Sequence, residues 1–254
     1  MLADLLALDV FQFLLVMTRL SAAIMGMPGL GGAAVPIRFR LIMALAITLL
    51  VVPLVAKTLP PMPGNVPDLI ILLVQEIAIG AFLGLMAQAM MVALNLAGTV
   101  MAMQSSLTNV LTNDPITQEQ SSLLPGFFAN VALVLIFLTD THHLMLNAVF
   151  ASYELFRPGG SLPTGDFAHV LTHTVGEAFA LGVQLAGPIV IFGLVFNGGL
   201  ALVNRLMPQM QVFFVAMPAQ VLGGLSMVMI SLPVLMAWFM RYFDDSLTAL
   251  GGGR

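Results

Sequence analysis

Four residues in the second half of the chain have metal-binding side chains and a spacing that would bring them together. Asp166, His169, His173 and Glu177 follow one another at intervals of three, four and four, so on a helix they would share one face. Imidazole nitrogens and carboxylate oxygens are common zinc ligands. The same spacing is also typical of an amphipathic helix that enters a membrane surface. No zinc motif accompanies it, and we therefore expect no metal and no other cofactor.

Apart from that face, the sequence carries no recognised catalytic motif. HExxH, GxSxG and the phosphate-binding GxxxxGK[ST] are absent, which argues against zinc hydrolases, serine hydrolases and nucleotide hydrolases. His142 and His143 are adjacent, so on a helix their side chains would point to different faces. We predict that the chain is not an enzyme. An intramembrane hydrolase that uses its His, Asp and Glu groups is the weakest alternative.

Four ionisable residues lie within apolar runs, where burial is costly and each is a functional candidate for that reason. They are Arg19, Glu76, Asp140 and Glu177. Arg19 paired with Glu76 or Asp140 would be a structural contact between helices. A proton or ion relay is the alternative, and with broken helices it would suit an ion-coupled secondary transporter. Such transporters usually contain inverted repeats, which this sequence does not show.

The composition indicates which elements must position these residues. Of the 254 residues, 59% are hydrophobic and 8% are charged, against about a quarter charged in soluble domains. The mean hydropathy is +1.04. The chain is therefore predicted to be an integral membrane protein with an all-α fold. Its formal net charge of −4, with no basic stripe, argues against nucleic-acid binding.

Six apolar runs are separated by links rich in proline and glycine, and we expect kinked hairpins within one membrane domain, residues 1–254. The runs are Val10–Pro28, Leu41–Ala56, Leu69–Met103, Leu123–Tyr153, Val175–Val203 and Val212–Met240. As a helix the third run would be about 52 Å long, whereas the hydrocarbon layer is about 30 Å thick. It must break, with Gly98 a candidate position, or continue beyond the bilayer. Within it, Gly80 and Gly84 form a GxxxG that favours close helix packing.

A polar segment, Gln104–Ser122, interrupts the apolar sequence and contains no basic residue. Against lipid its unpaired backbone groups would cost several kcal/mol each, so it must face water or line a protein-walled cavity. We predict that it lies in or over a pore. Its candidate residues are Gln104, Ser105, Ser106, Thr108, Asn109, Asn113, Asp114, Pro115, Gln118 and Glu119. Nearby methionines would form either a deformable seal or ordinary packing; they are Met86, Met90, Met91, Met101 and Met103.

A second polar bend lies within Asn204–Pro218, between the last two apolar runs. Proline lacks the N–H that a helix needs, and glutamine side chains can hydrogen-bond the freed carbonyl groups. A specifically shaped helical hairpin with a role in assembly is therefore predicted. Its candidate residues are Arg205, Pro208, Gln209, Gln211, Phe213, Phe214 and Pro218.

Several segments, in the same order along nearly the whole chain, resemble the FliR family of the flagellar type III secretion export gate. They are GMPGLGGAAVPIRFRLIMALAITLL, TNDP, FLTDTHHLMLNAVFASYELFRPG and NRLMPQMQVFFVAMP. The resemblance implies a non-enzymatic, cofactor-free subunit that assembles with FliP-like and FliQ-like subunits into a closed helical pore. It also implies contact with an FlhB-like subunit, passage of unfolded secreted proteins, and a place in the bacterial inner (plasma) membrane, in the flagellar basal body.

The resemblance further implies a role for the polar segment. In the family, the loop between the third and fourth runs plugs the pore, and by position this loop is Gln104–Ser122, with Asp114-Pro115 matching the family's DP. Small, mostly uncharged residues would block ions and still yield to a passing polypeptide, whereas charged rings would select by charge. A flagellar and a virulence-related secretion system both remain open.

Overall fold

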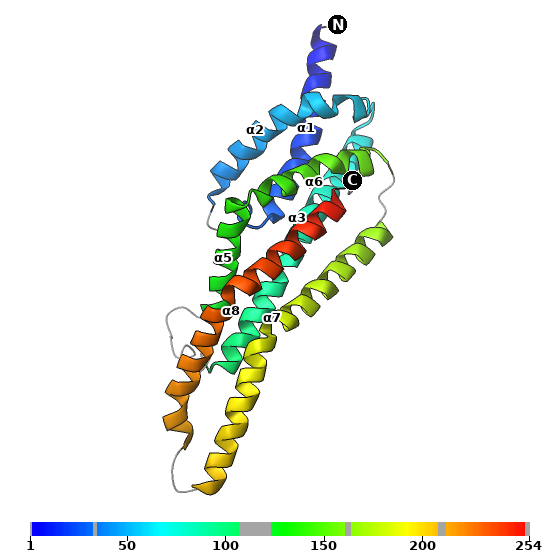
Figure 1. Cartoon of the computed structure of the whole chain (residues 1–254). Helices are drawn as coiled ribbons and strands as arrows, with labels where there is room; N and C mark the ends of the chain where they lie inside the picture. Colours follow the sequence, from blue (N-terminus) through cyan, green and yellow to red (C-terminus); the bar gives the residue numbers. More distant parts are fainter. Residues whose placement is uncertain (1, 33–34, 107–122, 161–163, 208–211, 252–254) are drawn as a thin grey trace. The chain divides into compact units, whose positions relative to one another are not determined.

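The computed structural model describes residues 2–32, 35–106, 123–160, 164–207 and 212–251. Every regular element in these ranges is a helix (Figure 1). The helices are α1 (Leu2–Gly26), α2 (Ile37–Val55), the 3-10 helix η1 (Ala56–Thr58), α3 (Val66–Gln104), α5 (Leu123–Leu138), α6 (Thr141–Leu155), α7 (Thr164–Leu206) and α8 (Val212–Leu250). The predicted all-α fold is confirmed.

Several of these helices are long and apolar enough to cross a membrane. In the described residues, four meet both conditions: Ile37–Thr58, Val66–Gln104, Gly165–Leu206 and Ala216–Leu250. The pair α5 and α6 adds a fifth when it is counted as one broken span. The apolar part of α1, Val10–Gly26, is shorter. The six predicted apolar runs are therefore helical, while the helices of the described residues that are long and apolar enough to span a membrane number four or five.

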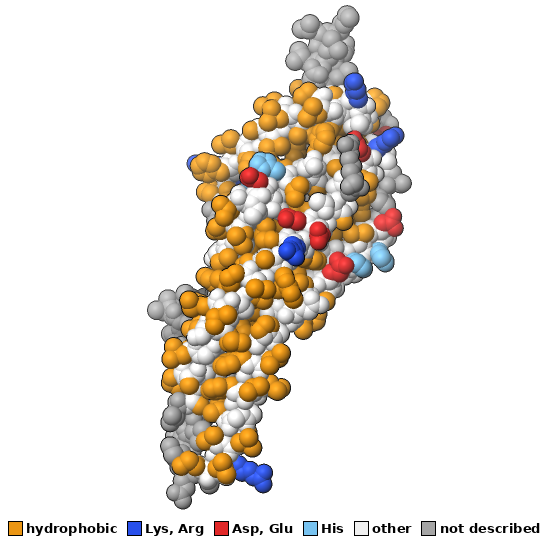
Figure 2. Space-filling model, viewed as in Figure 1, with side chains coloured by type: hydrophobic (Ala, Val, Ile, Leu, Met, Phe, Trp, Pro, Cys, Tyr) orange, Lys and Arg blue, Asp and Glu red, His pale blue; other side chains and the backbone are white. Residues whose placement is uncertain are grey.

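The outer surface of the helices is apolar, as a membrane protein requires. Of α2, only Ala44, Thr48 and Val55 are buried, and Leu50 is 72% exposed. Hydrophobic side chains cover most of the face seen in Figure 2, and charged ones are few. Apolar surface of this extent needs lipid or a protein partner to cover it.

The overlong third run forms one uninterrupted helix. α3 contains 39 residues, which corresponds to about 58 Å, and Gly98 lies inside it. The expectation of a break at Gly98 is therefore wrong. A Cβ added at Gly98 would lie 2.6 Å from the backbone N of Pro125, so this glycine provides space for the start of α5. The alternative expectation, that the helix extends past the hydrocarbon layer, agrees with its length.

The described helices belong to two compact units. The first comprises Met1–Met90, Ile136–Thr174 and Phe243–Arg254, and the second comprises Met91–Leu135 and Val175–Tyr242. In the first unit, Phe11, Leu15 and Leu72 form a buried cluster, and α1 contacts α2. α3, α5, α7 and α8 each contribute residues to both units. The single domain over residues 1–254 stays a prediction.

The GxxxG of α3 brings two helices of the first unit close together, as predicted. A Cβ added at Gly80 would meet the carbonyl oxygen of Arg19, and one added at Gly84 would lie 2.8 Å from the carbonyl oxygen of Ala23. Both positions are buried. Glycine is needed here because α1 and α3 approach at backbone distance, where no side chain fits.

A substitution at this crossing should therefore destabilise the fold. We expect Gly84→Ala to cost about 1–3 kcal/mol through overpacking, measured as a lower thermal unfolding temperature of the protein in detergent. Gly176→Ala on α7 is the matched control, because a Cβ there meets nothing within 4 Å. In the control, alanine's higher helix propensity should leave stability unchanged or raise it by about 1 kcal/mol. Equal effects at both positions would contradict the close approach.

Candidate functional site

Arg19, in the second half of α1, is completely buried within the first unit. Its Nε donates to Glu76 Oε2 at 2.6 Å, and its Nη2 donates to Glu76 Oε1 at 2.9 Å. Nη2 also donates to the carbonyl oxygen of Phe156 at 2.9 Å, and Nη1 donates to Ser152 Oγ at 3.2 Å. The guanidinium carbon lies 4.1 Å from the centre of the Tyr153 ring. Each guanidinium nitrogen therefore has a partner, and the Glu76 contact is bidentate.

This ion pair joins α1, α3 and α6. Of the two partners considered for Arg19, Glu76 is the one it contacts. A buried charge without a partner costs several kcal/mol, so a bidentate pair with further hydrogen bonds is the arrangement that makes its burial tolerable. Ser152 and the Phe156 carbonyl complete it and lie at the end of α6. The contacts support the structural interpretation of Arg19 and Glu76.

Asp140 and Glu177, the other two candidate intramembrane charges, lie elsewhere and are exposed. Asp140 precedes α6 and its Oδ1 lies 3.8 Å from His143 Nδ1. Glu177 lies on α7. The described partners of Glu76 and Asp140 are basic side chains rather than other acids, so these contacts do not form the chain of acids that a relay would use.

The spaced residues Asp166, His169, His173 and Glu177 all lie on α7 and are exposed. Among the described residues, none of them belongs to a group of three ligand atoms close enough to hold a metal. Between them, the Phe167 ring stacks on Phe82 with centroids 4.1 Å apart and meets Phe156 edge-on at 5.1 Å. An aromatic residue thus attaches the start of α7 to α3 and to the end of α6 within the first unit.

A pocket of about 470 Å³ in the first unit lies beside the buried ion pair. Its lining includes Glu76 from α3, Glu154 from α6, Arg157 from the following turn and Asp166 from α7. Glu154, Arg157 and Asp166 are exposed, so the pocket connects the buried Glu76 to a charged rim.

The start of the polar segment is described for Gln104, Ser105 and Ser106, and it is held within the second unit. The buried side chain of Gln220 on α8 donates from Nε2 to the carbonyl oxygen of Gln104 at 2.9 Å. A Cβ added at Gly224 would meet the Cβ of Ser105, and one added at Gly193 would meet Oε1 of Gln104. Three contacts from α7 and α8 therefore fix the point where α3 ends.

The remaining predicted residues of this segment lie outside the described residues. They are Thr108, Asn109, Asn113, Asp114, Pro115, Gln118 and Glu119. At the far end, Pro125 lies in the first turn of α5 and packs against Gly98 of α3, again within the second unit. Both flanks of the segment are thus attached to this unit.

The methionines near the segment are mostly packing residues. Met86, Met90, Met91 and Met101 are buried, whereas Met103 is 61% exposed. A buried methionine fills space among its neighbours and is not available to seal an open passage. Of the five, Met103 alone has the exposure that a seal requires.

The predicted hairpin bend lies between α7 and α8. Arg205 is exposed in the last turn of α7, and Pro218 is exposed inside α8. Phe213 and Phe214 fall in the first turn of α8. Pro208, Gln209 and Gln211 lie outside the described residues.

Apart from Glu76, the residues that contact Arg19 and the start of the polar segment were not identified from the sequence. Gln220 is the clearest case, and its signal was a single amide side chain in the apolar run that follows Pro218. Gly193 and Gly224 carried a weaker signal, because glycine inside an apolar helix often marks a close approach. Ser152 and Tyr153 carried none, since serine and tyrosine at helix ends are common.

Comparison with known proteins adds a family. Residues 10–246 match the family described as bacterial export proteins, family 1. The chain is 38% identical to the flagellar biosynthetic protein FliR of Caulobacter vibrioides, over 93% of this chain and 94% of that one. It is 29% identical to FliR of Bacillus subtilis, over 96% and 95% of the two chains. Yop proteins translocation protein T of Yersinia pestis is 28% identical, over 86% and 84%.

The buried ion pair generates a stability prediction. Arg19→Leu or Glu76→Leu alone should cost about 3–5 kcal/mol, because each leaves an uncompensated buried charge. The double variant should recover most of that loss, since apolar residues can replace a buried pair at little cost. The measurement is the yield and thermal unfolding temperature of protein purified in detergent.

Arg38→Leu is the control for the loss of a positive charge, because Arg38 is exposed on α2. It should leave stability within about 0.5 kcal/mol of the parent. If the loss of stability in the double variant equalled the sum of the losses in the two single variants, the two residues would not act as a pair. The structural interpretation would then fail.

Proposed function

The chain belongs to family 1 of the bacterial export proteins, and on this premise we propose that it is a pore-forming subunit of the flagellar type III export gate. The similarity to proteins named FliR over more than nine-tenths of both chains is the observation that carries this proposal. The Yersinia relative is named for the translocation of Yop proteins, which supports protein transport as the activity. Long apolar helices support an inner-membrane location.

A non-enzymatic export component fits the site. The buried charges form a bidentate ion pair inside the fold, which is an arrangement for holding helices together rather than for acid–base chemistry. The apolar outer surface needs partners or lipid. We propose that FliP-like and FliQ-like subunits cover part of it, that an FlhB-like subunit also contacts the chain, and that the complex lies in the flagellar basal body.

We further propose that Gln104–Ser122 plugs the pore. The segment contains two charged residues, both acidic, among uncharged side chains, and such a loop can obstruct ions without selecting a polypeptide by charge. Attachment at both flanks supports this role: Gln220 and Gly224 hold the start, and Gly98 receives Pro125 at the end. A plug must return to one place after each passage, and fixed ends limit where it can go.

Replacement of residues 107–122 by a short Gly/Ser linker should make cells permeable to small ions while the complex still assembles. The reason is that the obstruction is removed and the helices are not. Permeability is measured with a membrane-potential dye, and assembly by co-purification with the FliP-like and FliQ-like subunits. The same replacement at residues 61–64, a link between α2 and α3, is the control. Unchanged permeability in an intact complex would refute the plug while leaving the family assignment in place.

The hydrogen bond from Gln220 should affect gating without affecting assembly. Gln220→Leu leaves the Gln104 carbonyl without this donor, at a cost of about 1–3 kcal/mol, so we expect ion leakage between that of the parent and that of the linker variant. Gln184→Leu on the exposed side of α7 is the matched control and should leave permeability unchanged. Leakage equal in both glutamine variants would show that the contact at Gln104 does not position the segment.

A further inference from the structure

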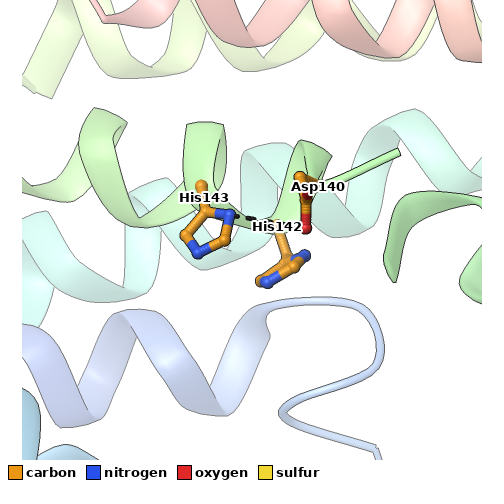
Figure 3. Close-up of side chains that lie close together, drawn as sticks. All are labelled: Asp140, His142 and His143. Carbon is orange, nitrogen blue, oxygen red and sulfur yellow. Dashed lines mark ion pairs between the residues drawn. The ribbon is translucent and has the colours of Figure 1, made fainter. Parts of the chain in front are cut away.

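Three metal-ligating side chains converge at the break between α5 and α6. Asp140, His142 and His143 each offer a ligand atom, and these three atoms lie within 4.8 Å of one another. Figure 3 shows the three side chains close together on the same side of the ribbon at the start of α6. The two imidazole rings have centroids 4.1 Å apart. The expectation that adjacent histidines would point to different faces is therefore wrong.

The local backbone explains this convergence. Asp140 has φ 58 and ψ 15, in the left-handed region, and α6 begins at the next residue. The backbone N–H of His143 donates to the Asp140 carbonyl at 2.9 Å, which closes a turn. Both histidines stand in the first turn of the helix, where no preceding turn restricts their side chains. All three ligands come from one turn of the first unit, so their proximity depends on no distant contact.

Neighbouring side chains hold this turn in place. Thr141 Oγ1 donates to Asp244 Oδ1 of α8 at 3.0 Å, and it lies 2.8 Å from Thr139 Oγ1. The Phe137 ring lies against His142, with centroids 5.0 Å apart. His142 Nδ1 is buried and has no hydrogen-bond partner among the described residues. A buried nitrogen in this condition is uncommon, since such atoms usually have a partner, and coordination would provide one.

The ligand set matches a divalent metal ion of intermediate softness, which binds both nitrogen and oxygen ligands. Two imidazole nitrogens and one carboxylate oxygen bind Zn²⁺ at about 2.0–2.2 Å, which places ligand atoms about 3.3 Å apart in a tetrahedron. The same donors suit Ni²⁺ and Cu²⁺ and do not suit Mg²⁺, which prefers oxygen. Asp140 and His143 are 75% and 70% exposed, so rotation of their side chains can bring the three atoms together.

We propose that Asp140, His142 and His143 bind a divalent transition metal ion of the zinc class, with water in the fourth position. The ion would link the residue before α6 to the first turn of that helix, and it would fix the break between α5 and α6. The inference does not depend on the export function. It rests on the three converging ligands and on the buried, unpartnered nitrogen of His142.

The test is metal titration of the full chain in its complex, purified in detergent through a tag without histidine. We expect about one Zn²⁺ per chain by calorimetry, and for Co²⁺ the visible absorption of a four-coordinate ion. The chain has four histidines and no cysteine, which allows a matched pair of variants. His142→Gln with His143→Gln should abolish the binding event, whereas His169→Gln with His173→Gln on α7 should retain it.

A further variant separates coordination from folding. Asp140→Asn keeps the size of the side chain but weakens the ligand, so affinity should fall about 10-fold or more while the complex stays assembled. Zinc binding that survives the His142 and His143 substitutions would overturn the proposal. Loss of binding in the His169 and His173 control, or the absence of any zinc binding by the parent complex, would overturn it equally.

Discussion

The buried ion pair between Arg19 and Glu76 is the interaction on which the packing of the first unit depends. A charged group away from water is tolerable only when its donors are paired, and Arg19 donates to Glu76, to Ser152 and to the Phe156 carbonyl. These acceptors come from α3 and from the end of α6. Pairing the hydrogen-bond donors of Arg19 therefore requires α1, α3 and the end of α6 to pack together. Glycine at position 80 is part of the same arrangement, because α3 must approach the Arg19 backbone closely.

The same requirement acts at the end of α3 in the second unit. The last carbonyl groups of a helix have no hydrogen-bond partner within that helix. At the end of α3 a protein side chain supplies such a partner, because the residues there are largely buried. Gln220 supplies a donor to Gln104 from α8, while Gly224 allows Ser105 to lie against that helix. The transition from apolar helix to polar segment is thus made inside a packed environment. This connects local backbone chemistry to the proposed plug, which must be held at its base to obstruct a passage.

Much of the fold is readable from single residues and short runs. The run Leu69–Met103 became α3, Val66–Gln104, and the run that begins at Leu123 became α5 and α6. Within the predicted run Leu123–Tyr153, the polar residues Thr139–His143 contain the break between α5 and α6. Two local inferences were wrong, each for its own reason. Gly98 was expected to break a helix, but Pro125 packs against it, and His142 and His143 were expected to diverge, but the left-handed Asp140 starts the helix immediately before them.

By itself, the sequence determined that the chain is built from membrane helices, where those helices run and where polar chain interrupts them. These properties follow from hydropathy and backbone preference, which act over a few neighbouring residues. Only the tertiary structure decided that Arg19 pairs with Glu76, 57 residues away, and that Gln220 holds Gln104 across 116 residues. Such contacts depend on which helix faces approach one another. When a helix is apolar on all sides, its own sequence does not indicate which face packs against which neighbouring helix.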